Sequence, residues 1–305
     1  MKILVIGGTG FIGRHLCPFL AKEHEVVVMS RNPPAAKNGL KDHDNISYRQ
    51  GDVTNRVHVF AAVEGMDYVV NLASTVIPST SNLDPVYDVQ SNLVGAINIL
   101  DAAVEHKIKK LVFISSGGTV YGEGTGKPFK ETDPTNPVCS YGIVKLAIEK
   151  YIQMYHRLYG LPYAILRVSN PYGPGQISDK PQGVISIFAN RVVSREQIEI
   201  WGDGTVSRDF IYVEDLVYGI VMALSKRAPS LIINIGSGRA DSLNEIVWVL
   251  GTELGITPHV IFRKMRAFDV RHSCLDISEA VEQFGWKPSV ALRAGIRKLI
   301  SENSF

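Results

Sequence analysis

Tyr141 and Lys145 are the two residues of this 305-residue chain whose types and spacing most directly predict chemistry. They are four positions apart, so on a helix they would lie on the same face. A phenol with a pKa of about 10 is a poor base at neutral pH. A neighbouring ammonium favours the phenolate and lowers that pKa. The pair is therefore a candidate for exchanging a proton with a substrate hydroxyl.

A glycine-rich turn near the N-terminus predicts a bound ligand that acts together with this pair. Gly7, Gly10 and Gly13 follow the first apolar run and open a helical pattern that includes Phe11 and Ile12. One glycine makes the tight turn, one lets the backbone approach a pyrophosphate, and one lets helix and strand pack closely. The helix N-terminus offers free N–H groups to the anion. We expect a nicotinamide dinucleotide here, which would accept or return hydride during the proton exchange.

The second strand leaves the choice between NAD and NADP open. It ends Met29-Ser30-Arg31, without the carboxylate that would bind ribose hydroxyls. Arg31 would accept a 2′-phosphate, as in NADP, or stack on the adenine, unless it is a solvated surface arginine. Further cofactor contacts are expected where later strands end, at these positions: Asp52 and Val53 near the adenine, and Leu72, Ala73 and Ser74 near the pyrophosphate and ribose.

The elements that must position these residues alternate between apolar strands and amphipathic helices. The predicted strands are 3–6, 25–29, 46–49, 68–72, 111–115 and 163–168, and the predicted helices are 12–21, 57–63, 86–104 and 141–158. Continuous Val/Ile/Leu runs are typical of strands buried on both faces. The order predicts an α/β fold, a doubly wound parallel sheet. Residues 1–168 would form the dinucleotide-binding domain, with a segment near 207–240 returning to it, and 169–305 a smaller α/β substrate-binding region.

Composition excludes several classes of function. The net charge of +2 gives no long-range field to recruit nucleic acid or an anionic membrane. No apolar stretch approaches the roughly 18 residues that a membrane span needs. Cys17, Cys139 and Cys274 are far apart and have no metal-ligand spacing. We expect a soluble, cytoplasmic protein without a metal site, without a nucleic-acid partner and without a membrane partner.

Six motifs give the chain a resemblance to a known family over nearly its whole length. They are GGTGFIG at 7–13, SSGGTVYG at 115–122, YGIVK at 141–145, RVSNPYGPGQ at 167–176, IWGDGTVSRDFIYVEDL at 200–216, and LDIS with FGWKP between 275 and 288. With these the chain resembles the extended short-chain dehydrogenase/reductase family, in its UDP-glucose 4-epimerase branch. The resemblance implies a Rossmann-type fold and an NAD-dependent nucleotide-sugar epimerase.

The resemblance also implies a mechanism. Tyr141 would take the proton of the sugar C4 hydroxyl while hydride passes to NAD⁺, and the 4-keto sugar would turn over before hydride returns to its other face. The third catalytic group of the family is a Ser or Thr. Counting from Tyr141 places it on Ser116, whereas counting from Thr-Val-Tyr-Gly places it on Gly117. Ser116 is our choice, and Thr119 is the alternative.

Further roles follow from the matched positions. Asn92 would make a cofactor-side hydrogen bond, and Asn170 would contact the substrate phosphates or sugar. Arg208 and Arg266 match two arginines that clamp a nucleotide diphosphate, a role suited to the guanidinium fork. The remaining two matches are Asp269, for the ribose, and Ser273, a small residue at a gating position, which would admit an N-acetyl group and hence UDP-GlcNAc. The family implies a homodimer formed through the helices near 86–104 and 141–158.

The resemblance allows three alternatives to epimerisation. A 4,6-dehydratase needs an Asp-Glu pair where this chain has Gly118-Thr119. A nucleotide-sugar 4-ketoreductase would release its cofactor at each turnover and prefer NADPH, which suits Ser30-Arg31. Relatives that serve as RNA-binding or regulatory proteins often lose the Tyr-Lys pair, and this chain keeps it. Since fold alone does not establish function, the pair carries the choice.

Overall fold

The computed structural model describes residues 1–305 except 33–42, 125, 177–182, 226–229, 265–269 and 303–305. Its centre is a parallel sheet that, in the described chain, has seven strands in the order β10-β6-β5-β4-β1-β2-β3. The strands are β1 (Lys2–Ile6), β2 (Glu25–Ser30), β3 (Ile46–Gln50), β4 (Tyr68–Asn71), β5 (Lys110–Ser116), β6 (Tyr163–Val168) and β10 (Leu231–Ile235). The prediction of a doubly wound parallel sheet is confirmed.

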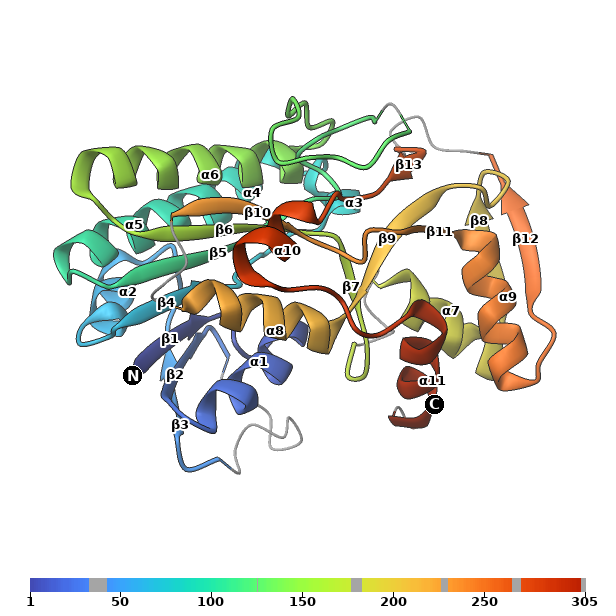
Figure 1. Cartoon of the computed structure of the whole chain (residues 1–305), viewed down its shortest axis with the longest axis horizontal. Coiled ribbons are helices and arrows are strands. Elements are labelled where there is room, and N and C mark those ends of the chain that lie inside the picture. The colour runs from blue at the N-terminus through green and yellow to red at the C-terminus, as the bar shows by residue number, and fades with distance from the viewer. Residues whose placement is uncertain (33–42, 125, 177–182, 226–229, 265–269, 303–305) are drawn as a thin grey trace.

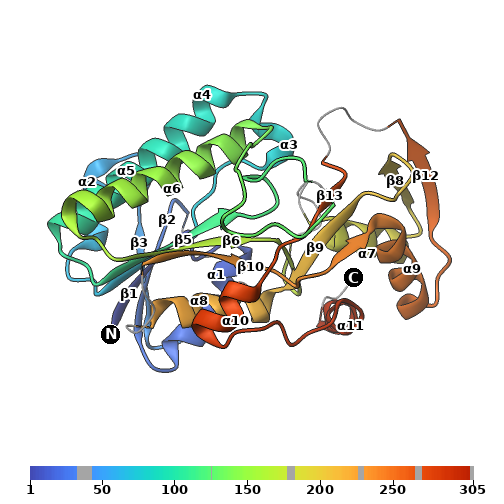
Figure 2. The same cartoon turned by 45° about the horizontal axis from the view of Figure 1, so that its top comes forward.

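Helices cover both faces of this sheet (Figures 1 and 2). On one face lie α2 (Arg56–Val63), α4 (Pro85–Asp88), α5 (Gly95–Glu105) and α6 (Ser140–Tyr159), with the short α3 (Pro78–Ser81) near the start of α6. On the other lie α1 (Phe11–Ala21), α8 (Val213–Leu224) and α10 (Ser278–Phe284). The strands are Val/Ile-rich because both of their faces are buried, with one apolar core on each side.

The predicted helix 86–104 is divided in the structure. A π-helical stretch, η1 (Val89–Val94), separates α4 from α5. Hydrophobic periodicity cannot distinguish this wider turn from an α-helix, since only a few residues change their angular position. π-helical turns are rare and frequently occur at functional sites. Here the turn contains Ser91 and Asn92, which are both buried.

The second half of the chain builds a smaller lobe at one end of the sheet (Figure 1). Its strands are β7 (Asn170–Tyr172), β8 (Gln197–Trp201), β9 (Ser207–Tyr212), β11 (Ala240–Ser242), β12 (His259–Arg263) and β13 (His272–Ser273), and its helices are α7 (Val184–Val193), α9 (Leu243–Leu254) and α11 (Leu292–Glu302). β9 pairs with β7, β11 and β13, so it belongs to this lobe. The parts of 207–240 that return to the large sheet are β10, paired with β6, and α8, packed on α1.

Candidate active site

The strand order reverses between β1 and β4, and the predicted cofactor loop lies at that point. Ligands of doubly wound sheets bind outside the carboxyl ends of the strands where the order reverses. Gly7 follows β1 in a left-handed conformation, with φ of +79°, and a Cβ there would lie 3.1 Å from the Ala73 nitrogen after β4. Leu72 and Ala73 therefore lie directly against the glycine turn, as the predicted cofactor contacts require.

The start of α1 fits a pyrophosphate. A Cβ at Gly13 would lie 2.3 Å from the Gly8 carbonyl oxygen, so only glycine allows this approach of helix and loop. Gly10 is the N-cap and makes no side-chain capping hydrogen bond, which leaves the first amide groups of α1, at Phe11 and Ile12, to a ligand. The residues present therefore fit a dinucleotide.

The predicted catalytic pair lies on the first turns of α6. This helix begins at Ser140, whose N–H donates to Oδ1 of Asn82 at 2.9 Å, so a side chain from outside the helix caps it. Lys145 Nζ lies 5.6 Å from the centre of the Tyr141 ring and donates to the Ile114 carbonyl of β5 at 2.8 Å. The pair thus faces the carboxyl ends of the central strands, the edge of the sheet at which the predicted cofactor loop also lies.

Two hydroxyls hydrogen-bond the Tyr141 phenol. Burial raises the pKa of Tyr141 to about 12, while hydrogen bonds with Ser74 and with Ser116 act in the opposite direction. Ser74 was predicted only as a cofactor-lining residue, and its position on the phenol depends on β4 lying beside β5. Thr119 Oγ1 is buried without a hydrogen-bond partner in the described structure. The phenol therefore contacts Ser116 and not Thr119.

Lys145 is a buried ammonium, with only 5% of its surface exposed. Burial lowers the pKa of Lys145 to about 8, against the charges of Asp88 and Glu149, which raise it. Glu149 is four residues further along the same face of α6 and accepts three hydrogen bonds from the buried Arg167 of β6. Burial and the two carboxylates therefore act on the pKa of Lys145 in opposite directions.

Asn92 does not present a free amide to the cofactor. Its Oδ1 accepts from the Thr75 N–H at 3.0 Å, and its Nδ2 donates to Thr75 Oγ1 and to Asp88 Oδ1, both at 2.9 Å. Thr75 follows Ser74 directly, so Asn92 fixes the segment that carries one of the two hydroxyls on the phenol. The π-helical turn places Asn92 there.

The residues expected near the adenine make contacts within the protein. Arg31 is exposed just beyond β2, and its carbonyl accepts from Gln50. The Asp52 carboxylate accepts from the N–H and hydroxyl of Thr54, which lower the pKa of Asp52, and the charge of Arg31 acts in the same direction. Val53 packs closely on Gly95 of α5.

Substrate-side residues meet where the two lobes join. Asn170 of β7 donates to the Asp209 carbonyl at 2.9 Å, and its amide lies 3.9 Å from the position of a Cβ at Gly118. Arg208 of β9 is half-buried and pairs in register with Ser273 of β13. Arg266 and Asp269 lie outside the described residues.

Two further groups near the pair carried no prediction: Asp88, and the Glu149–Arg167 ion pair at 2.7 Å. The signal for Asp88 is a carboxylate four residues before Asn92 on one helical face. The signal for Glu149 is its continuation of the Tyr141, Lys145 spacing. Neither pattern shows by itself what the carboxylate contacts.

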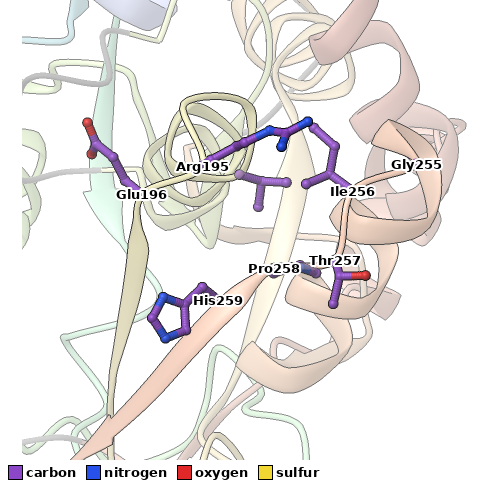
Figure 3. Close-up of a pocket in the computed structure, with 8 residues that line it drawn as sticks. Arg195, Glu196, Gly255, Ile256, Thr257, Pro258 and His259 are labelled. Atoms are coloured by element: carbon purple, nitrogen blue, oxygen red, sulfur yellow. The ribbon is translucent and has the colours of Figure 1, made fainter.

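A cavity of about 360 Å³ lies elsewhere, between the end of α7 and the start of β12 (Figure 3). In it the Arg195 side chain extends toward Ile256, while Glu196 extends from just before β8 and His259 from the first residue of β12. None of the predicted site residues lines it.

Across the described residues, no cluster of His, Cys, Asp or Glu is arranged to hold a metal ion. Within the same part of the chain, no helix combines the length and apolar composition that crossing a membrane requires.

Comparison with known proteins places this site in context. Residues 3–236 match the model of the NAD dependent epimerase/dehydratase family. A putative UDP-glucose 4-epimerase of Methanocaldococcus jannaschii is 37% identical over 98% of this chain and 97% of its own length. A dTDP-4-dehydro-6-deoxyglucose reductase of Escherichia coli is 32% identical over 98% and 96%. The crystal structure of UDP-glucose 4-epimerase with UDP-glucose from Thermotoga maritima superposes with a TM-score of 0.94, at 32% identity, over 99% of this chain and 98% of that one.

Proposed function

Because the chain belongs to the NAD-dependent epimerase/dehydratase family, we propose that it is a UDP-hexose 4-epimerase that interconverts UDP-glucose and UDP-galactose. The observation that carries the proposal is the Tyr141 phenol at the carboxyl ends of β4 and β5, beside a buried ammonium and two hydroxyls. Such a group fits the removal and return of one proton at a secondary alcohol. The relative from M. jannaschii and the structure from T. maritima support the choice of substrate.

The roles of the residues follow from their contacts. Bound NAD⁺ would supply the hydride acceptor, and its positive charge would lower the pKa of Tyr141 from its raised value. Tyr141 would take the proton of the C4 hydroxyl and later return it, while Ser116 holds that hydroxyl in place. Lys145 supports the phenolate, and Ser74 holds the phenol by a second hydrogen bond. Because the sugar leaves with the oxidation state it had on entry, no reductant is consumed.

The substrate-binding roles are proposed for positions whose residue types match those of the family. Arg208 would bind the diphosphate, with Arg266 as its partner, and Asp269 would contact the ribose. Ser273 is small and adjoins Arg208 in the register of β9 and β13. We expect turnover of UDP-GlcNAc for this reason, and Ser273→Tyr should lower it at least tenfold more than turnover of UDP-glucose. Equal losses on both sugars would contradict the role of Ser273.

The direct test is incubation of the purified protein with UDP-glucose, with UDP-GlcNAc and with their C4 epimers, without added cofactor, followed by separation of the products. We expect each pair to approach one equilibrium ratio from both sides. Tyr141→Phe should lower the rate by about 10³-fold or more, since a positioned acid–base group contributes about 10²–10⁴-fold. If none of the four sugars is converted to its C4 epimer, the proposal is wrong.

A 4-ketoreductase is the second candidate, supported by the E. coli reductase and by Ser30-Arg31 at the end of β2. Such an enzyme would need stoichiometric NADPH or NADH and would reduce a 4-keto sugar nucleotide. Retained cofactor in the purified protein favours the epimerase, whereas a strict need for added reduced cofactor favours the reductase.

We further propose a homodimer formed through α4, η1, α5 and α6. The exposed face of α6 carries apolar side chains at helical spacing: Ile143, Tyr151, Met154 and Leu158. The neighbouring segment adds Leu83, Val86, Val89 and Val94. Exposed apolar side chains gathered on neighbouring segments in this way are typical of a protein interface.

A further inference from the structure

Asp88 is a buried carboxylate beside the catalytic pair. Its side chain is 0% exposed where α4 meets η1. Ser140 Oγ donates to its Oδ2 at 2.8 Å, and Asn92 Nδ2 donates to its Oδ1 at 2.9 Å. Among the described residues, no Lys, Arg or His makes an ion pair with it. A buried carboxylate with only neutral donors is costly, so its position calls for a functional reason.

Two carboxylates act on the Lys145 ammonium, and their charges are not equivalent. Glu149 forms a buried ion pair with Arg167 at 2.7 Å, so a guanidinium largely cancels its charge. Asp88 has no such partner in the described chain. The charge of Asp88 therefore acts on Lys145 without a compensating cation, and both residues are buried, so water screens it little.

Asp88 is also placed to fix the geometry of the pair. It holds the hydroxyl of Ser140, and Asn82 holds the N–H of the same residue. Tyr141 follows Ser140 directly. The first turn of α6 is therefore attached at two points to the segment that ends in Asp88.

We propose that Asp88 is a positioning residue whose charge keeps the buried Lys145 ammonium protonated beside Tyr141. This inference rests on the proposed function, in which that ammonium supports the phenolate. Burial lowers the pKa of Lys145 to about 8, and the charge of Asp88 opposes a further fall toward neutral pH. The same charge raises the pKa of Tyr141.

Other groups that face the pair act differently. The hydroxyls of Ser74 and Ser116 bond the phenol, and Cys139 lies close enough to raise its pKa. The ring of Phe113 lies 4.8 Å from Lys145 Nζ. Removing the Asp88 charge should lower the pKa of Lys145, which moves the alkaline limb of the activity profile toward lower pH.

The experiment compares Asp88→Asn, which removes the charge and keeps the size, with Ser140→Ala, which removes a hydrogen bond and keeps the charge. Asp101→Asn is the matched control, because Asp101 of α5 accepts from Arg56 and Tyr155 instead of acting on the pair. Asp88→Ser is a second neutral variant for the case that Asp88→Asn does not fold. Folding is checked by circular dichroism.

Two readouts are taken on the NAD-loaded proteins. One is the pH profile of epimerisation. The other is the titration of the Lys145 amine without sugar, followed by NMR of the labelled lysine side chains, in which the signal that Lys145→Met removes is assigned to Lys145. We expect both to move to lower pH by about one unit in the neutral Asp88 variants, and to stay in place in Ser140→Ala and Asp101→Asn.

A folded neutral variant at position 88 with an unmoved titration step would overturn the inference, as would an equal shift in Asp101→Asn. The lysine titration needs no substrate, so its outcome is separate from the proposed function. A shifted step in a protein that epimerises no sugar would support the role of Asp88 and remove the epimerase. An unmoved titration step in a protein that epimerises its sugar would overturn the role of Asp88 and support the epimerase.

Discussion

At the scale of single residues, the site consists of a phenol, an ammonium and two hydroxyls that together can move one proton. Spacing along one helix was sufficient to predict that Tyr141 and Lys145 lie close together. It was not sufficient for Ser74, because the hydroxyl reaches the phenol only through the adjacency of β4 and β5. The choice between Ser116 and Thr119 was open for a similar reason, since counting residues across a loop does not give the direction of a side chain.

Ser116→Ala and Thr119→Val should therefore behave differently. Ser116→Ala should lower kcat by about 10²-fold, because it removes a hydroxyl from the reacting group. Thr119→Val should change kcat less than about threefold. It should also leave the free energy of unfolding equal or up to about 1 kcal/mol higher, since a buried hydroxyl without a partner is removed. Steady-state rates and urea unfolding of both variants test this, and the reverse order of losses would assign the role to Thr119.

Lys145→Met should be inactive yet more stable at neutral pH. The pKa of Lys145 is about 8 in the folded chain against an ordinary value of 10.5. Below pH 8 the folded protein carries the positive charge of Lys145 in a buried position, which lowers its stability. Between pH 8 and 10.5 the folded lysine has lost its proton while the unfolded one keeps it, so wild-type stability rises with pH through this window.

We expect the variant to exceed the wild type by about 1–3 kcal/mol at pH 7. The difference should shrink as the pH approaches 10.5. Urea unfolding of both proteins at pH 7 and pH 10, without cofactor, measures it. A stability gain that is the same at both values would show that burial of charge is not its cause.

At the scale of elements, α6 is held by polar contacts at its start and in its middle. Asn82 and Asp88 hold the first turn, and the Glu149–Arg167 pair joins the middle of the helix to β6. Alternating apolar runs predicted six strands of the sheet to within two residues, because strands buried on both faces are apolar throughout. They did not predict η1 or the polar ties, because the partners come from distant parts of the chain.

Arg167→Met should destabilise the fold by about 3–5 kcal/mol, since it leaves Glu149 buried without its cation. The double variant Arg167→Met, Glu149→Leu should recover most of that loss, because the unpaired charge is then gone. Urea unfolding of the wild type, both single variants and the double variant completes the cycle. Strictly additive losses would mean that the two side chains do not act as a pair.

At the scale of the whole molecule, a large sheet carries the cofactor loop and a smaller lobe brings Asn170 and Arg208 to its edge. The order of strands and helices was enough to predict the large sheet. It was not enough to place β9, whose apolar pattern fits either lobe and whose partners are the short strands β7, β11 and β13.

The proposed dimer belongs to this scale. Met154→Glu combined with Leu158→Glu places two charges on the exposed apolar face of α6 and should convert the dimer to a monomer. Trp248→Glu is the control, because Trp248 is 62% exposed on α9 in the other lobe and should leave the dimer intact. Sedimentation velocity distinguishes the two masses. A wild type that is monomeric at all concentrations would contradict the dimer.

The central claim, reversible oxidation at the sugar C4 without net redox change, is tested most directly with UDP-glucose deuterated at C4 and no added cofactor. If the same hydride leaves and returns, the UDP-galactose formed should keep its deuterium at C4, with none lost to water. Mass spectrometry of the separated product measures this. Loss of the label to solvent, or product formation only with added NADPH or NADH, would contradict the account.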